Sequence, residues 1–225
     1  MTKAGIQVAI DGPAGAGKST VAREVARRLD YLYIDTGAMY RALTWLALQK
    51  DIDLNDESAL SLLAEATDIR LLPALEGLKV LINGQDVTDA IRLPEVSRHV
   101  SQVAAVAGVR VPMVRLQQRL AEECGVVMDG RDICAYVLPR AEVKIFLTAS
   151  IEERARRRYL EMSAKGVDIT LEQLQADIAQ RDKEDECRDV APLVKAEDAQ
   201  LLDTTGMDRE AVVQQVLQMV HKAGG

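Results

Sequence analysis

One glycine-rich segment limits what this chain can fold into. It reads Gly12-Pro13-Ala14-Gly15-Ala16-Gly17-Lys18-Ser19 and fits the pattern G-x-x-x-x-G-K-[ST]. The apolar run Ile6 to Ile10 ends just before it, and Val21, Val25 and Leu29 recur at helical spacing just after it. A loop between a buried strand and a helix N-terminus presents backbone N–H groups and a partial positive charge to phosphates. The segment therefore predicts an α/β fold that binds a nucleotide.

The same loop predicts the atoms that hold the nucleotide. Lys18 would reach the β and γ phosphate oxygens of ATP, and the Ser19 hydroxyl would ligate Mg²⁺. The predicted ATP-binding residues are Gly12, Pro13, Ala14, Gly15, Ala16, Gly17, Lys18, Ser19 and Thr20. The motif alone does not separate motors, GTPases and small-molecule kinases. The chain has 225 residues, short for a motor, and shows no Asn-Lys-x-Asp guanine-reading pattern, so the acceptor side has to decide.

Short apolar runs predict a buried parallel sheet. Near-continuous apolarity is typical of strands covered on both faces. The runs are Ile6 to Ile10, Leu32 to Ile34, Val126 to Met128, Val143 to Leu147 and Leu201 to Leu202. Helical patterns separate them, with capping-box patterns at Ser150 to Glu153 and Thr170 to Gln173 and a last helix after Asp208. We predict one α/β domain over residues 1–225, built on a doubly wound five-stranded parallel sheet.

One segment departs from the alternation of strands and helices. Ile69 to Leu72, Lys79 to Ile82 and Gln85 to Val87 read as short strands with polar interruptions. Asn83-Gly84 joins the last two and favours a type I′ hairpin turn, which needs positive φ at both positions. Residues 66–92 are therefore predicted to form a small antiparallel insert.

Composition and charge limit the binding partners and the cellular compartment that we expect for this chain. The net charge of −7 and the pI of about 5.0 argue against a nucleic-acid polymer as partner. No run of about 18 apolar residues predicts a membrane span, and no signal region precedes the first apolar run. Cys124, Cys134 and Cys187 are widely spaced and suggest neither disulfides nor a zinc site. We expect a cytoplasmic protein with reduced thiols.

Polar residues follow two of the predicted strands and mark the acceptor side. Strand Leu32 to Ile34 leads into Asp35 to Arg41, and strand Val126 to Met128 leads into Asp129 to Asp132. Ligands of open α/β sheets bind at the carboxyl ends of the strands. Arg41 and Arg131 lie there and suit bidentate capture of an acceptor phosphate, although a solvated surface arginine is the alternative for each. Asp129 would either orient Mg²⁺-bound water or cap its strand.

Two further charged groups allow a functional and a structural interpretation. Arg181, Asp185 and Arg188 have the spacing of one helix face, which also suits a surface salt-bridge ladder. The run Arg154 to Arg158 follows the fourth strand, where a charge run usually forms a solvated face. Spacing alone leaves both choices open.

Four motifs taken together resemble the bacterial cytidylate kinases of the nucleoside monophosphate kinase family. They are IDGPAGAGKST (10–20), DTGAMYR (35–41), DGRD (129–132) and RDVAPL (188–193). The similarity runs in order over essentially the whole chain and includes the antiparallel insert. It implies transfer of the γ-phosphoryl group of ATP to CMP, with dCMP as a further acceptor, on a P-loop kinase fold with a helical lid.

The resemblance also implies residue roles that spacing could not show. Positions 36–101 would form the monophosphate-binding region. The matching residues contact cytosine (Thr36, Arg110, Asp132, Arg188), the CMP phosphate (Arg41, Arg131) and the sugar (Ser101, Arg181, Asp185). A lid over about 152–168 would bring arginines to the transferring phosphoryl group. Arg157 and one of Arg154 or Arg158 are expected to act there together with Lys18 and Arg131.

One stretch departs from the family pattern. After Asp132 the family usually continues Ile-Gly-Thr-Val-Val-Leu-Pro, whereas this chain has Ile-Cys-Ala-Tyr-Val-Leu-Pro at 133–139. Cys134 would not easily adopt positive φ, and Tyr136 would add bulk near the acceptor phosphate. Two other functions stay open: a P-loop kinase for another acceptor such as UMP or a small polyol, and a nucleotide-binding regulator without turnover. A monomer is expected.

Overall fold

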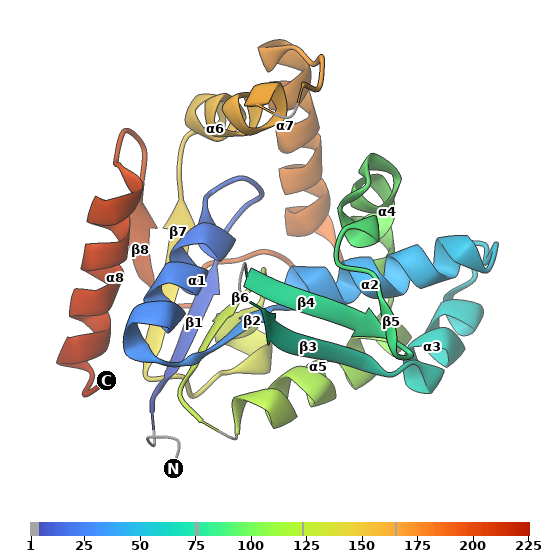
Figure 1. The fold of residues 1–225 in the computed structure, drawn as a ribbon, viewed down its shortest axis with the longest axis horizontal. Helices are drawn as coiled ribbons and strands as arrows, with labels where there is room; N and C mark the ends of the chain where they lie inside the picture. Colours follow the sequence, from blue (N-terminus) through green and yellow to red (C-terminus); the bar gives the residue numbers. More distant parts are fainter. Residues whose placement is uncertain (1–4, 75–76, 123, 165) are drawn as a thin grey trace.

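A computed structural model describes residues 5–74, 77–122, 124–164 and 166–225. Its main element is a sheet of five parallel strands in the order β2-β6-β1-β7-β8 (Figure 1). The strands are β1 (Gln7–Asp11), β2 (Leu32–Asp35), β6 (Val126–Asp129), β7 (Val143–Thr148) and β8 (Gln200–Asp203). All five predicted strands are confirmed, each shifted by no more than one residue at either end.

Alternate strand residues face two separate cores. Ala9, Ile34 and Met128 belong to the core on one face of the sheet. Val8 and Val127 belong to the core on the other face. Because both faces are covered, consecutive apolar residues in the middle of the sheet, 8–10 of β1 and 126–128 of β6, are all buried. The doubly wound arrangement predicted from the apolar runs is confirmed.

Two helices cover one face of the sheet, and the longer middle part of the chain covers the other. α1 (Lys18–Leu29) and α8 (Arg209–Lys222) pack on the face of the sheet that carries Val8 and Val127. The opposite core includes residues of α2 (Thr36–Gln49), α3 (Glu57–Ala66), α4 (Pro94–Ala105) and α5 (Ala107–Ala121). Asp35 ends β2 and accepts a hydrogen bond from the Ala38 N–H, so it caps α2 at the sheet edge.

The predicted antiparallel insert is a three-stranded sheet of its own. β3 (Ile69–Ala74) pairs with β4 (Gly77–Ile82), and β4 pairs with β5 (Gln85–Asp86). Asn83 and Gly84 both have positive φ, 49° and 83°, as the hairpin turn requires. Residues 75 and 76 of the insert lie outside the described residues. A short 3₁₀ turn, Ala90–Arg92, leads from the insert to α4.

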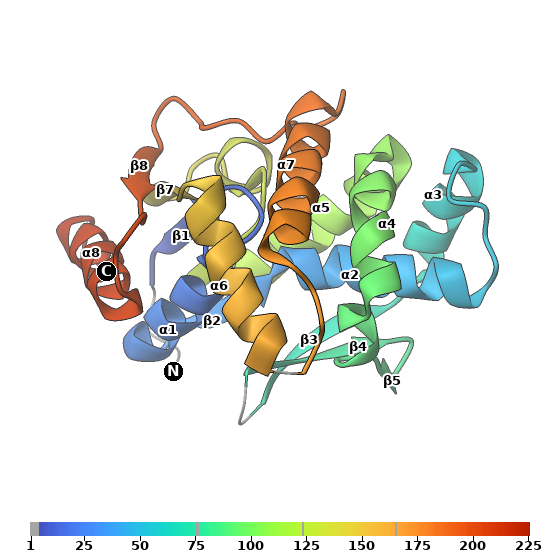
Figure 2. The same ribbon diagram turned by 90° about the horizontal axis from the view of Figure 1, so that it is seen from above.

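Two helices lie beyond the carboxyl ends of the strands, α6 (Ile151–Ala164) and α7 (Leu171–Cys187), and they pack side by side (Figure 2). Thr170 and Gln173 form the predicted capping box at the start of α7. The box predicted at Ser150 is half formed: the Ser150 hydroxyl accepts from the Glu153 N–H, while the Glu153 carboxylate binds Arg156 and Arg157. The predicted lid corresponds to α6 and the turn after it, apart from residue 165, which is not described. No helix in the described ranges is long and apolar enough to cross a membrane.

Candidate active site

The glycine-rich loop follows β1 directly and leads into α1, as predicted. Gly12 has φ 146°, and a Cβ there would lie 1.9 Å from the Leu147 carbonyl oxygen of the neighbouring strand. Only glycine therefore fits at the first turn of the loop. The Lys18 Nζ donates to the Pro13 carbonyl oxygen at 2.8 Å, so the ammonium group is folded against its own loop. Burial and Arg131 hold the pKa of Lys18 well below its usual range.

Ser19 is joined to the end of β6. Its hydroxyl donates to one carboxylate oxygen of Asp129 at 2.8 Å, and the Tyr33 hydroxyl donates to the other at 2.9 Å. Burial is the main cause that raises the pKa of Asp129 to about 6, and the negative charge of Asp35 also contributes. Hydroxyl and carboxylate oxygens are ligands that suit Mg²⁺. In the described ranges no group of three or more His, Cys, Asp or Glu side chains is arranged to hold a metal ion by itself.

Asp11 ties the nucleotide loop to the acceptor side. It is the last residue of β1 and is 1% exposed. Its two carboxylate oxygens accept the backbone N–H groups of Ile133 and Cys134, each at 2.8 Å. These two residues follow Asp132 directly, so the carboxylate fixes the backbone that carries Arg131 and Asp132. Burial raises the pKa of Asp11 to about 6.

The Asp11→Asn variant should change how stability depends on pH. Folded Asp11 keeps a proton up to about pH 6, whereas the ordinary pKa is 3.8. Between these values the folded state binds more protons than the unfolded state, so this group makes the free energy of unfolding fall as pH rises. We expect the difference in unfolding free energy, wild type minus variant, to fall by about 2 kcal/mol from pH 4.5 to 7.5.

Urea denaturation across this pH range measures the difference. Asp177→Asn, at an exposed position of α7, serves as the control and should show no such dependence. A difference between wild type and Asp11→Asn that stays constant with pH would show that Asp11 does not titrate near pH 6.

Both arginines predicted to bind the acceptor phosphate, Arg41 on α2 and Arg131 after β6, are paired with carboxylates. Arg41 Nη2 lies 3.2 Å from an Asp35 carboxylate oxygen, and Arg131 Nε lies 2.7 Å from one of Asp185. Burial acts to raise the pKa of Asp185, but Arg131 outweighs it and holds that pKa below the usual range. The surface-arginine alternative does not fit, because both side chains are largely buried, at 20% and 19% exposed.

Of the four residues predicted to read the base, Arg110, Asp132 and Arg188 meet in one buried cluster, whereas Thr36 is bonded to the end of β6. Arg110 on α5 donates to one carboxylate oxygen of Asp132, and Arg188 Nη2 lies 3.7 Å from the other. The Thr36 hydroxyl donates to the Asp129 carbonyl oxygen at 2.7 Å. Burial raises the pKa of Asp132, while Arg110 and Arg188 act in the opposite direction.

Arg188 corrects one prediction. The spacing of Arg181, Asp185 and Arg188 suggested one helix face, but α7 ends at Cys187 and Arg188 has extended backbone angles at the C-cap. Its Nε donates to the Ala191 carbonyl oxygen, so the turn after the helix aims the side chain at Asp132. A surface ladder is excluded, since the Arg188 and Asp132 side chains are each 6% exposed.

Arg181 lies in the same region as the other cations. Burial, together with repulsion from Arg131, Arg41 and Arg158, lowers the pKa of Arg181 to about 10. Four guanidinium groups from α2, α6, α7 and the end of β6 therefore influence one another here. Ser101, the other residue predicted to hold the sugar, lies half-buried on α4.

The lid arginines differ from one another in their contacts. Arg154 is 4% exposed and donates to the Ala14 carbonyl oxygen and to Asp182 on α7. Arg157 donates to the Ala16 and Thr204 carbonyl oxygens and so also contacts the loop. Arg158 is 40% exposed and pairs with Glu161. Arg154 and Arg157 thus join α6 to the loop. Arg158 instead lies close enough to Arg181 for their charges to repel each other.

The stretch that departs from the family pattern carries no backbone strain at Cys134. Positive φ among described non-glycine residues occurs only at Asp30, Asp51, Asn83 and Ala191. Residues Ile133–Val137 form a π-helical turn, and the thiol is buried against the Ala9 carbonyl oxygen. The expected difficulty with positive φ is therefore wrong, because this turn does not need it. Tyr136 is 49% exposed.

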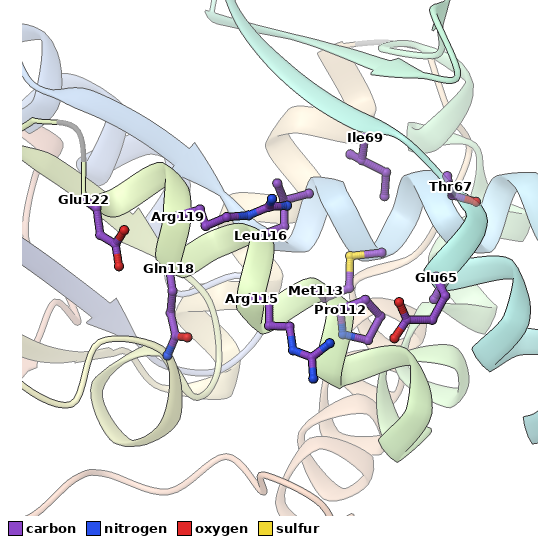
Figure 3. A pocket seen from close by; sticks show the side chains of 11 residues that line it. Glu65, Thr67, Ile69, Pro112, Met113, Arg115, Leu116, Gln118, Arg119 and Glu122 are labelled. Carbon is purple, nitrogen blue, oxygen red and sulfur yellow. The ribbon is translucent and has the colours of Figure 1, made fainter.

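A cavity of about 510 Å³ lies elsewhere, between α5 and the α3–β3 segment (Figure 3). Met113 and Ile69 contribute apolar atoms to its wall, and Arg115, Arg119, Glu65 and Glu122 contribute charged groups of both signs. No residue predicted to bind ATP or the acceptor lines it.

Several site residues escaped the sequence analysis. Asp11 binds the acceptor-side backbone, Asp35 pairs with Arg41, and Asp182 binds Arg154. Asp11 and Asp35 did carry a signal, since each is a carboxylate at the end of an apolar strand. Asp182 carried none, because its partner is 28 residues away on another helix.

Comparisons with known proteins agree on one family. The sequence model of the cytidylate kinase family matches residues 8–222. A cytidylate kinase of Bacillus subtilis (strain 168) is 55% identical over 217 residues, covering 96% of this chain and 97% of the relative. One of Geobacillus sp. (strain WCH70) is 56% identical over 220 residues, covering 98% of each. The fold resembles that of an uncharacterized protein from Eubacterium ventriosum ATCC 27560, with a TM-score of 0.51, 14% identity, and 96% and 98% of the two chains covered.

Proposed function

This chain belongs to the cytidylate kinase family, and we propose that it transfers the γ-phosphoryl group of ATP to CMP through the residues gathered at the ends of β1, β2 and β6. One observation carries the assignment of the acceptor end. A buried carboxylate, Asp132, stands between two guanidinium groups, Arg110 and Arg188. Cytosine presents one amino donor beside two acceptors, N3 and O2, so one acceptor and two donors complement its edge.

The nucleotide end follows from the loop. Lys18 exchanges the Pro13 carbonyl oxygen for the β and γ phosphate oxygens of ATP, and backbone N–H groups of Gly12 to Thr20 surround the phosphates. Ser19 and Asp129 form a hydroxyl–carboxylate pair that fits Mg²⁺, with Ser19 as the ligand and Asp129 next to it. Bound there with ATP, Mg²⁺ supplies neutralisation of phosphate charge.

The acceptor needs no general base. A CMP phosphate oxygen is already anionic at neutral pH, so the protein contributes position and charge neutralisation. Arg41 and Arg131 bind the acceptor phosphate, and Ser101, Arg181 and Asp185 bind the sugar. Thr36, Arg110, Asp132 and Arg188 contact the base. We expect dCMP as a second acceptor, a monomeric protein and a cytoplasmic location.

Asp132 should determine the choice of base. UMP places an acceptor where CMP has its amino donor, so the Asp132 carboxylate would face an oxygen of like sign. Sites built to hydrogen-bond one group reject analogues by as much as ~10⁴. We expect Asp132→Ala to lower kcat/KM for CMP by about 10²-fold while affecting UMP much less, so that the two substrates converge.

ADP release with ATP, Mg²⁺ and a panel of monophosphates measures this for wild type and variant. Equal losses on CMP and UMP would mean that Asp132 supports the geometry of the site without reading the base. A wild type that prefers UMP or a polyol would favour another P-loop kinase, and ATP binding without turnover would favour a regulator.

A further inference from the structure

Several buried polar atoms lack a hydrogen-bond partner in the protein. In the described part of the chain they are Tyr40 Oη, both amide atoms of Gln117, Arg181 Nε, Asp182 Oδ1 and Arg188 Nη2. A buried polar atom without a partner destabilises the folded state. Arg181 and Arg188 already have a place in the proposed function. Tyr40 and Gln117 have none, although they account for half of these atoms.

Tyr40 lies against Arg110, and Gln117 lies on the same helix as Arg110. Tyr40 follows Thr36 by one turn of α2, and Gln117 follows Arg110 by two turns of α5. The central carbon of the Arg110 guanidinium lies 5.6 Å from the centre of the Tyr40 ring. Tyr40 is 7% exposed and Gln117 is 1% exposed, so solvent does not explain their polar groups. Tyr40 therefore contacts, from inside the protein, the guanidinium that binds Asp132.

Tyr40 interacts electrostatically with the charged residues of the base cluster, which are Arg110, Arg188 and Asp132. Burial raises the pKa of Tyr40 to about 12, with Arg110 and Arg188 opposing this, Asp132 adding to it and the Gln117 side chain lowering it. Gln117 thus lies beside the Tyr40 hydroxyl, but the two are not in hydrogen-bond geometry. Arg110, Arg188 and Asp132 carry one surplus positive charge, and the π face of Tyr40 attracts the guanidinium above it.

We infer that Tyr40 and Gln117 are positioning residues for base recognition. The Tyr40 ring holds Arg110 against Asp132, and Gln117 fixes the Tyr40 hydroxyl when the base draws Arg110 and Asp132 toward itself. The atoms that are unpaired in the free protein then gain hydrogen-bond partners only in the complex with CMP. Part of the binding free energy therefore depends on contacts to the cytosine edge. This inference rests on the proposed function, in which Arg110 and Asp132 contact cytosine.

Gln117→Met tests the role against a neighbour on the same helix. Methionine has a similar volume and removes both unpaired atoms, so the melting temperature should not fall. We expect the CMP-over-UMP ratio of kcat/KM to fall about tenfold, the value of roughly one hydrogen bond, with KM for ATP unchanged. Gln118→Met is the control: it removes a 3.0 Å bond to the Val137 carbonyl oxygen, so it should lower the melting temperature and keep the ratio.

Tyr40→Phe provides a second variant if Gln117→Met does not fold. It keeps the ring under Arg110 and removes only the unpaired hydroxyl, and the same two readouts apply. An unchanged CMP-over-UMP ratio in a folded variant overturns the inference, as does a variant that loses stability and weakens ATP and CMP equally. If the wild type itself does not prefer CMP, the proposed function fails and this inference fails with it.

Discussion

Lys18→Ala should lower turnover by a factor of about 10³ and leave the fold intact. Lys18 is a buried cation of the glycine-rich loop, and it is 6% exposed. Because burial already holds its pKa well below the usual range, removing the charge relieves a cost in the free protein. We therefore expect an equal or higher melting temperature together with the loss of activity.

The measurement combines kcat for CMP with thermal unfolding of the same preparation. Lys18→Met keeps the length of the side chain without its charge and should be equally inactive. Lys222→Ala, at an exposed position at the end of α8, is the matched control and should behave like wild type. Near-normal turnover of either Lys18 variant would contradict the kinase assignment.

The second large effect is expected at the lid. The sequence pointed to Arg157 and to one of Arg154 or Arg158, and their contacts now separate them. Arg154 and Arg157 are held by backbone carbonyl oxygens, whereas Arg158 is half exposed and lies in the field of Arg181. We expect Arg158→Ala to lower kcat by about 10³-fold with little change in KM for CMP, as for an arginine that binds only the transition state.

Two other variants test whether the transition-state role belongs to Arg158. Arg156→Ala removes an outward-facing arginine, 59% exposed and paired with Glu153, and should leave kcat unchanged. Arg157→Ala should raise KM for ATP and lower the melting temperature, because it loses its bonds around Thr204. If Arg157→Ala shows the pure kcat loss and Arg158→Ala does not, the transition-state role belongs to Arg157.

The sheet and the loop could be predicted because their signals are local. Five apolar runs and a glycine-rich motif each carry their information within a few residues, and so does the Asn83-Gly84 turn. Arg188 was misplaced for the opposite reason. Its direction depends on where α7 ends and on the Ala191 carbonyl oxygen, and neither follows from an i, i+7 spacing.

The partners of Asp11 and Arg154 could not be predicted from the sequence. Asp11 binds backbone 122 and 123 residues away, and Arg154 contacts Ala14 at a separation of 140 residues. No periodicity links such positions. The half-formed capping box at Ser150 has a related cause, since Glu153 has stronger partners in Arg156 and Arg157 than the backbone N–H it was expected to bind.

In the proposed function, the pairing of Arg41 with Asp35 and of Arg131 with Asp185 would make binding of the acceptor phosphate an ion exchange. An arriving phosphate must displace a carboxylate of lower charge from each guanidinium, so a doubly charged monoester competes better than a singly charged one. A nucleoside without phosphate offers no anion, and both arginines stay on their carboxylates. The site would therefore select ligands by the charge of their phosphate group before it discriminates between their bases. The same exchange would release Asp185 on α7 from Arg131, so binding of the acceptor phosphate would change a contact of that helix.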